Sequence, residues 1–248
     1  MRHVGARASS LTYEKLSFWD CRHQRAPRHW RVNSPCRIAG LAVSSLAVDA
    51  AEFLAGCIRL LCGVRRLPAA CLPAAPGIFF ANHSSHLDFA VLWAALPGDE
   101  RQRTRPVAGR DYWEATPLRR WIARRVFCAV LIERQNVTTA NNPLALMLAA
   151  LDAGHSLIVF PEGTRSTDGV MHDFKPGLFH LARARPALPL VPVYLENLNR
   201  MLPKGDILAV PLIASVTVGR PLHLGADENK LDFLARARQA VVALHADS

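Results

Sequence analysis

Beyond residue 76, short apolar runs alternate along the chain with segments whose apolar positions recur at helical spacing. The run 77–81 is continuously apolar and the run 156–160 nearly so, which is typical of strands buried on both faces of a sheet. Strands separated by helices predict an α/β fold whose mostly parallel central sheet is covered by helices, with functional groups at the strand–helix junctions. We also expect strands over residues 105–108, 126–132, 188–195 and 207–218, and helices over residues 84–96, 117–125, 143–152, 174–184 and 226–246.

Proline, asparagine and glycine refine some of these boundaries. Asn142 is placed to cap a helix whose first residue is Pro143, and Gly154 is placed to end it. Because proline has no N–H to donate, Pro189 and Pro192 predict that the strand 188–195 lies at an edge or a bend of the sheet.

The first 66 residues differ in composition from the rest of the chain. Residues 1–35 carry seven Lys/Arg against two acidic residues and no apolar run ahead of a cleavage site, so we interpret them as a basic, poorly ordered extension. Apolar residues 38–48 fall short of the ~20 that a membrane-spanning helix needs. We therefore predict two short helices, about 38–48 and 50–62, within a segment 36–66. We predict that this segment is a helical appendage that contacts the membrane surface, and the alternative is that both helices pack on the domain that follows at 67–248.

Positive charge is concentrated in particular regions. The formal net charge is +10, and residues 101–134 carry nine Arg against three acidic residues. Since Arg suits forked contacts to phosphate, this region could face an anionic membrane, a phosphorylated substrate or nucleic acid. Few aromatic residues apart from Trp113 and Trp121 are interleaved with the basic stretches, which disfavours nucleic acid.

The six cysteines show neither C-x-x-C pairs nor His partners at ligand spacing. A structural zinc site or a disulfide framework is therefore not expected. Scattered Cys residues in apolar stretches are usually small core residues in a reducing compartment, which predicts a cytoplasmic protein.

The first predicted strand–helix junction reads Asn82-His83-Ser84-Ser85-His86-Leu87-Asp88. The turn can bring the Asp88 carboxylate back onto one imidazole nitrogen of His83, which would fix the tautomer and leave the other nitrogen as a base. Imidazole is the side chain best matched to taking a proton from an alcohol at neutral pH. On spacing alone, a surface pair or a helix cap explains the same residues.

A second junction reads Phe160-Pro161-Glu162-Gly163-Thr164-Arg165-Ser166. Gly163 permits a tight backbone turn. Backbone N–H groups, the Thr164 hydroxyl and the forked Arg165 cation would form a phosphate cradle. Taken alone, the segment is equally a polar turn after a strand.

Together, the two junctions resemble the glycerolipid acyltransferases typified by 1-acylglycerol-3-phosphate (lysophosphatidic acid) acyltransferase. The first motif of that family, N-H-x-S-x-x-D, is present at 82–88, and the third, F-P-E-G-T-R-S, is complete at 160–166. The trailing F-K-x-G follows at 174–177. The second motif resembles Leu131-Ile132-Glu133-Arg134, and the fourth resembles Leu190-Val191-Pro192-Val193. The resemblance covers about residues 55–220.

The resemblance implies a role for each matched residue. His83 would be the general base and Asp88 its orienting partner. The reaction would need no metal, no cofactor and no acyl-enzyme, with acyl-coenzyme A or acyl-carrier protein as the donor. A lysophospholipid acceptor would be met at the cytoplasmic face of the cell membrane by a peripheral or monotopic protein. The substrate-binding residues implied are Glu162, Gly163, Thr164, Arg165, Arg134, Arg110 and Lys175.

The leading prediction is acylation of 1-acylglycerol 3-phosphate to phosphatidic acid, a step of phospholipid biosynthesis. One departure leaves the acceptor open: where the family commonly carries a lysine pair, this chain has Gly109-Arg110-Asp111, and Arg110 would supply the cation. An alternative acceptor is another lyso-lipid, such as lyso-ornithine lipid or a lysophospholipid. A different class of function is a non-catalytic protein that binds anionic lipid.

Overall fold

Six strands form one sheet in the order β3-β2-β4-β1-β5-β6. The computed structural model describes residues 45–134, 142–166, 170–198 and 213–245. All neighbouring strands from β3 to β5 run parallel, while β6 pairs antiparallel with β5. The predicted α/β class and mostly parallel sheet are confirmed. The strands are β1 (Ile78–Ala81), β2 (Thr104–Gly109), β3 (Val130–Ile132), β4 (Ser156–Val159), β5 (Leu190–Glu196) and β6 (Ser215–Val218).

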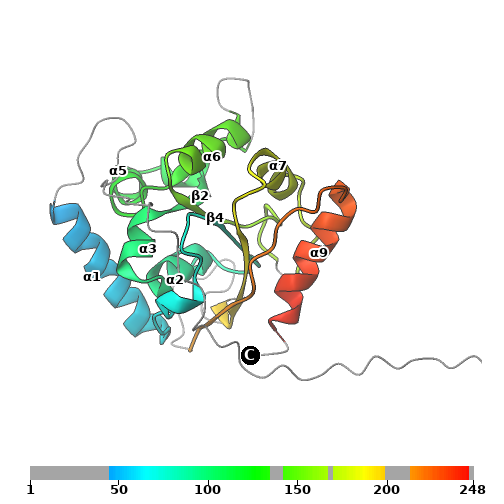
Figure 1. Cartoon of the computed structure of the whole chain (residues 1–248). Helices are drawn as coiled ribbons and strands as arrows, with labels where there is room; N and C mark the ends of the chain where they lie inside the picture. Colours follow the sequence, from blue (N-terminus) through cyan, green and yellow to red (C-terminus); the bar gives the residue numbers. More distant parts are fainter. Residues whose placement is uncertain (1–44, 135–141, 167–169, 199–212, 246–248) are drawn as a thin grey trace, which may run out of the picture.

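Helices cover both faces of this sheet (Figure 1). Two single turns, η2 (Ala69–Cys71) and the π-helical η3 (Ile122–Val126), accompany them. The helices are α1 (Ser45–Cys62), α2 (Asp88–Ala95), α3 (Gly98–Arg103), α4 (Arg110–Trp113), α5 (Pro117–Trp121), α6 (Pro143–Asp152), α7 (Gly177–Ala184) and α9 (Lys230–Ala243).

Side chains of the buried central strand β1 alternate between two apolar clusters. Phe79 and Ala81 pack in the cluster that includes α1 and α2, whereas Ile78 and Phe80 pack in the cluster under α6, α7 and α9. Figure 1 shows α1 and α2 on the left of the sheet and α7 and α9 on the right. A strand buried on both faces explains the continuous apolar run.

The predicted helix 84–96 begins later than expected, at Asp88. The reason is a turn around the Asp88 carboxylate, because the N–H groups of Ser84 and Ser85 both donate to it. The predicted helix 174–184 likewise begins only at Gly177.

The predicted strand 126–132 is wrong over its first half. The chain turns helically through η3, and Phe127 N–H still donates to the carbonyl of Ile122. Phe127 then packs edge-on against Trp93, with ring centroids 4.8 Å apart. The apolar character of this segment thus reflects burial between helices, and β3 begins at Val130.

The strand 188–195 is observed as β5, but its predicted place at an edge of the sheet is wrong. β5 lies between β1 and β6 and pairs with both. Pro189 precedes β5, and Pro192 lies just beyond the last β5–β6 pair, Val193–Val218, so neither missing N–H interrupts that ladder. Their carbonyls still accept hydrogen bonds, Pro189 from Ile78 N–H at 2.9 Å and Pro192 from Gly219 N–H at 2.8 Å. The expected caps of α6 are confirmed, since Asn142 Oδ1 accepts Leu144 N–H at 3.0 Å.

In the segment 36–66, the predicted break between two helices near residue 49 is wrong. One continuous helix, α1, runs through this position. Ala55 and Cys62 on α1 are buried in the core cluster that also contains α2. Glu52 forms an ion pair with the buried Arg101, and Arg59 Nη1 donates to the Ala94 carbonyl at 3.1 Å. The described part of this segment is therefore packed on the sheet-bearing body. The predicted extension 1–35 and residues 36–44 lie outside the described residues.

Candidate active site

The predicted site residues follow four adjacent parallel strands. Because the carboxyl ends of parallel strands meet at one edge, side chains that are remote in sequence converge there. Along this edge lie Arg134 just beyond β3, Arg110 after β2, residues 162–165 beyond β4, and His83 beyond β1.

His83 and Asp88 form a hydrogen-bonded pair. His83 Nδ1 lies 2.8 Å from Asp88 Oδ2, and Asp88 is fully buried. The same oxygen accepts the N–H groups of Ser84 and Ser85 at 2.6 and 2.9 Å. A carboxylate can only accept, so the imidazole proton is held on Nδ1 and Nε2 is left as the basic nitrogen.

The turn 160–166 holds His83 by its backbone and by its ring. Glu162 Oε1 accepts the His83 N–H at 2.7 Å, and Ser166 N–H donates to the His83 carbonyl at 2.8 Å. The Phe160 ring stacks on the imidazole, with centroids 4.4 Å apart and planes 24° apart. The imidazole is thus fixed before any substrate arrives.

Glu162 is a buried carboxylate, 2% exposed, whose two oxygens both accept backbone hydrogen bonds. Oε2 accepts His172 N–H at 2.8 Å, opposite the His83 N–H on Oε1. Burial raises the pKa of Glu162, and the two N–H donors and the charges of His83 and His172 oppose that rise. These contacts tie the turn 160–166 to the first junction, at His83, and to the segment that follows the turn, at His172.

Gly163 is required by both backbone conformation and close packing. Its φ is +71°, a region that favours glycine, and a Cβ there would lie 2.9 Å from the Lys175 Cδ. Lys175 N–H donates to the Pro161 carbonyl at 2.8 Å. The stem of Lys175 therefore crosses the turn, while Thr164 beside it is exposed.

Arg165 brings positive charge to the neighbourhood of His86. Burial lowers the pKa of His86, and the charges of Arg165 and then His83 lower it further, so these groups lie near one another. His86 stacks on Tyr112 with ring centroids 5.3 Å apart, and the Arg119 guanidinium lies 4.4 Å over that ring. The region beside His83 is consequently cationic and aromatic.

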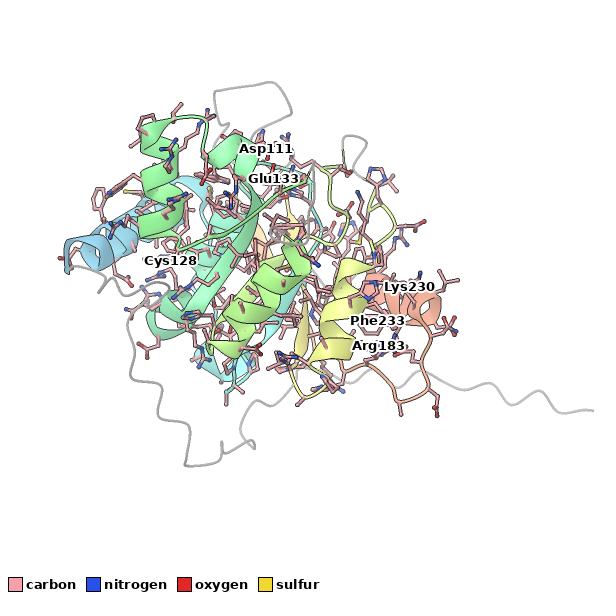
Figure 2. All side chains as sticks on the ribbon, turned by 90° about the horizontal axis from the view of Figure 1, so that it is seen from above. Asp111, Cys128, Glu133, Arg183, Lys230 and Phe233 are labelled. Carbon is pink, nitrogen blue, oxygen red and sulfur yellow. The ribbon has the colours of Figure 1, made fainter. Side chains whose placement is uncertain are left out.

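The ends of β2 and β3 combine cations with acids. Arg110 Nε lies 3.7 Å from Glu133 Oε2. The side chains of Asp111 and Arg134 both lie so close to Gly109 that a Cβ there would collide with them. Figure 2 labels Asp111 and Glu133 at these strand ends. The charges of Arg110 and Arg134 are therefore partly balanced by neighbouring carboxylates.

A cavity of about 230 Å³ opens beside His83. The first junction and the turn 160–166 form one wall of the cavity. The cavity is also lined by Tyr194 of β5 and by Arg238, Val242 and His245 of the C-terminal region. The sequence patterns gave no reason to include these four residues.

Asn82 is a further residue whose role the sequence did not reveal. Its amide donates to the Leu195 carbonyl at 2.9 Å and accepts the Leu195 N–H at 2.8 Å. It thereby extends the β1–β5 pairing by one position and fixes where the chain leaves the sheet ahead of His83. Asn82 and Ser166 both belong to the motifs at 82–88 and 160–166, and this membership was the sign in the sequence that they contribute to the site.

Among residues 45–134, 142–166, 170–198 and 213–245, no group of three or more His, Cys, Asp or Glu side chains could hold a metal ion. The chemistry available at the described edge is that of a base, an orienting carboxylate and several cations.

An exposed apolar surface lies on α1 and α5, and α5 borders the strand edge through Arg119, which lies over Tyr112. On α1, Phe53 and Leu60 are 75% and 85% exposed, and their helical positions lie opposite the core-facing Ala55. On α5, Leu118 and Trp121 are exposed next to Arg119 and Arg120. Within the described residues, no helix combines the length and apolar character needed to cross a membrane.

Comparisons with known proteins show which family the chain is similar to. The family model described as Acyltransferase matches residues 64–196. The 1-acyl-sn-glycerol-3-phosphate acyltransferase alpha of Homo sapiens is 33% identical over 128 residues, which cover 50% of this chain and 42% of that protein. The chloroplastic 1-acyl-sn-glycerol-3-phosphate acyltransferase LPAT1 of Arabidopsis thaliana is 27% identical over 183 residues, 73% of this chain and 47% of its own length. The chain thus spans about half the length of the curated relatives it matches.

The crystal structure of the 1-acyl-sn-glycerophosphate (LPA) acyltransferase PlsC from Thermotoga maritima has the same fold. Its TM-score is 0.65 at 20% identity, with 80% of this chain and 78% of that chain covered. The family model spans more than half of the chain and includes His83, Asp88 and the turn 160–166. The chain therefore belongs to the acyltransferase family.

Proposed function

We propose that this protein transfers a fatty acyl group from a thioester to the free hydroxyl of 1-acylglycerol 3-phosphate, giving phosphatidic acid. The observation that carries the proposal is the His83–Asp88 pair, held at a cationic strand edge by the turn 160–166. The names of the curated relatives support the same acceptor. Acyl-coenzyme A or acyl-carrier protein would be the donor, and neither a metal nor a cofactor takes part.

The free Nε2 of His83 takes the proton of the acceptor hydroxyl as its oxygen attacks the thioester carbonyl carbon. A C–O bond forms, and the C–S bond breaks as the tetrahedral intermediate collapses. The electron pair leaves on the thiolate, which receives the proton from His83. Asp88 stabilises the imidazolium that exists between these two proton transfers.

Charged side chains along the strand edge would bind the acceptor. The charge of Arg165 acts on His86, and Lys175 crosses the turn at Gly163. A forked guanidinium and an ammonium group suit a phosphate monoester. Thr164 would add a hydroxyl, and Glu162 would act through His83 because both its oxygens already accept backbone N–H groups.

A second acceptor class has support from the β2–β3 end of the edge. Arg110 faces Glu133, and Arg134 shares the space over Gly109 with Asp111, so these two cations are less available to a phosphate. This arrangement favours an acceptor whose head group is not a phosphate monoester, such as lyso-ornithine lipid or a zwitterionic lysophospholipid.

The decisive experiment offers the purified full chain several lyso-lipids together with either thioester donor. We expect turnover of lysophosphatidate, and we expect His83→Ala to lower kcat/KM by on the order of 10³-fold because a positioned base is lost. His180→Ala, on the exposed side of α7, is the matched control and should retain activity. Turnover of lyso-ornithine lipid without lysophosphatidate would replace the first acceptor by the second. Unchanged turnover in His83→Ala would refute the catalytic assignment.

We further propose that the apolar surface of α1 and α5 docks on the cytoplasmic face of the membrane as a peripheral contact. Phe53, Leu60, Leu118 and Trp121 would enter the interface while the neighbouring arginines meet anionic head groups. This contact would bring the strand edge to an acceptor whose acyl chain stays in the bilayer.

Vesicle sedimentation tests this docking surface. The double variant Phe53→Ser, Leu60→Ser should bind vesicles containing anionic lipid several-fold more weakly than the unaltered chain, since two apolar side chains no longer enter the bilayer interface. Leu231→Ser, which alters an equally exposed leucine on α9, is the control. Equal sedimentation of all three proteins would place the membrane contact elsewhere.

A further inference from the structure

Arg238 on α9 contacts the segment that supports Glu162. Its Nη2 donates to the Met171 carbonyl at 2.7 Å, and its Nε lies 3.9 Å from an oxygen of the exposed Asp173. Arg238 stands on a well-anchored helix, because its neighbours Phe233, Ala237 and Val241 are fully buried in the core. The family match ends at residue 196, so nothing in the motifs points to Arg238.

The peptide group between Met171 and His172 is held from two sides. Arg238 donates to its carbonyl oxygen, while its N–H, which belongs to His172, donates to Glu162 Oε2 at 2.8 Å. Glu162 Oε1 in turn accepts the N–H of His83 at 2.7 Å. Three hydrogen bonds in series therefore connect α9 to the backbone of His83.

Donation to a peptide carbonyl polarises the whole peptide group and strengthens hydrogen bonding by its N–H. The cation at Arg238 therefore makes the His172 N–H a better donor to Glu162. It also fixes the carbonyl in space, so that the N–H keeps its direction toward the carboxylate.

From these contacts we propose that Arg238 is a positioning residue for the catalytic pair, acting through the Met171–His172 peptide group and Glu162 on His83. The proposal rests on the proposed function, because His83 must be the base for its position to affect turnover. Arg238 also lines the cavity beside His83, so the competing role is direct binding of an anionic group of a substrate.

Kinetics of Arg238→Met separate the two roles. Methionine keeps much of the apolar stem and removes the donors. A positioning role predicts that kcat falls by on the order of tenfold, since small displacements of a catalytic group are costly, while KM stays within about twofold. Arg238→Lys, which keeps one donor and the charge, should recover most of kcat. Arg236→Met is the control, because Arg236 on the same helix contacts Glu228 and His223.

The pH profile adds a readout that loss of packing would not move. The titratable groups acting on Glu162 are His83 and His172, and its two N–H donors favour the ionised carboxylate. Weakening the His172 N–H removes part of that stabilisation, so the pKa of Glu162 rises further in Arg238→Met. The pKa of Glu162, followed by its carboxyl infrared band as the pH is lowered, should therefore be higher in this variant than in the unaltered chain and unchanged in Arg236→Met.

Amide hydrogen exchange keeps the test independent of turnover. Peptide fragments covering His172 and His83 should exchange faster in Arg238→Met than in the unaltered chain or Arg236→Met, with thermal melting recorded for all three. If no lyso-lipid is turned over by the unaltered chain, the proposed function fails. The exchange result still decides whether Arg238 holds the backbone of His172 and His83. A rise in KM at constant kcat with unchanged exchange would make Arg238 a substrate contact and overturn the proposal. Unchanged kinetics and exchange would overturn it as well.

Discussion

The two halves of the candidate site are built differently. At the ends of β1 and β4, His83 is held by Asp88, Glu162, Ser166 and Phe160 through its ring and both polar groups of its backbone. At the ends of β2 and β3, exposed or half-buried arginines face nearby acids without comparable ties.

This difference separates the part of the site that performs the reaction from the part that selects the acceptor. A base must be positioned before the reaction, and hydrogen bonds from the fold do that at no cost during the reaction. Surface cations partly balanced by acids can instead be redirected toward head groups of different shape. We therefore expect substitutions in the β1–β4 half to change kcat and substitutions in the β2–β3 half to change KM.

The largest expected effect comes from Asp88→Asn. The buried carboxylate oxygen that accepts three N–H groups loses its charge, so the imidazolium is no longer stabilised and the wrong tautomer becomes accessible. We expect kcat to fall on the order of 10³-fold, as measured at saturating acceptor. Asp111→Asn, the matched change in the β2–β3 half, should leave kcat nearly unchanged. Equal losses of kcat in the two variants would remove the distinction between the halves.

A smaller effect is expected from single arginine substitutions, measured as KM for lysophosphatidate. Arg165→Ala should raise KM by about tenfold or more, because a hydrogen bond to a charged group is worth roughly 1.5–3 kcal/mol. Arg110→Ala and Arg134→Ala should raise it only a few-fold, since each guanidinium already has a carboxylate nearby. The opposite ranking would assign acceptor recognition to the β2–β3 end and sharpen the case for another head group.

Sequence patterns predicted the α/β fold because strand and helix periods are local properties of the chain. The caps of α6 at Asn142 and Pro143 are equally local and were found for the same reason. The start of β3 was misplaced because burial between helices also produces an apolar run, as Phe127 shows. Periodicity alone cannot separate these two kinds of burial.

The candidate site was only partly visible in the sequence. The motifs identified His83, Asp88 and Glu162 as chemistry-bearing residues, but they could not tell which oxygen of Glu162 meets which N–H. The contact of Arg238 with a backbone carbonyl 67 positions away leaves no trace in composition or spacing. A hydrogen bond to a backbone atom depends on where that atom lies in the fold and not on which side chain the contacted residue carries, so the sequence does not mark it.

The smallest of the three expected effects is that of acid pH. It lowers activity through groups that include Glu162, which follows β4, and it lowers stability through His155, which precedes β4. Arginines stay charged at any working pH, whereas Glu162, whose pKa burial raises, accepts its two N–H groups more strongly when it is ionised. We therefore expect kcat to fall on acidification, because the base of the proposed reaction must be unprotonated and because Glu162, whose pKa lies above the ordinary 4.5 for Glu, loses its charge.

His155 lies just before β4, at the end of the sheet opposite the candidate site. Its protonation destabilises the fold. Burial and then the charge of Arg105 lower its pKa from 6.5 to about 4. Between these values the unfolded chain binds a proton that the folded chain does not. Acidification from pH 6.5 toward 4 thus lowers the free energy of unfolding, by up to about 1.4 kcal/mol per pH unit. Glu162 opposes this, because its raised pKa favours the folded, protonated form at low pH.

The variant His155→Gln separates the two acid effects. Urea unfolding between pH 8 and pH 5 should show a weaker fall of stability in this variant than in the unaltered chain, while the acid limb of kcat stays where it was. A limb that moved with His155→Gln would mean that loss of activity in acid reflects unfolding. In that case, protonation of groups in the catalytic half would not be its cause.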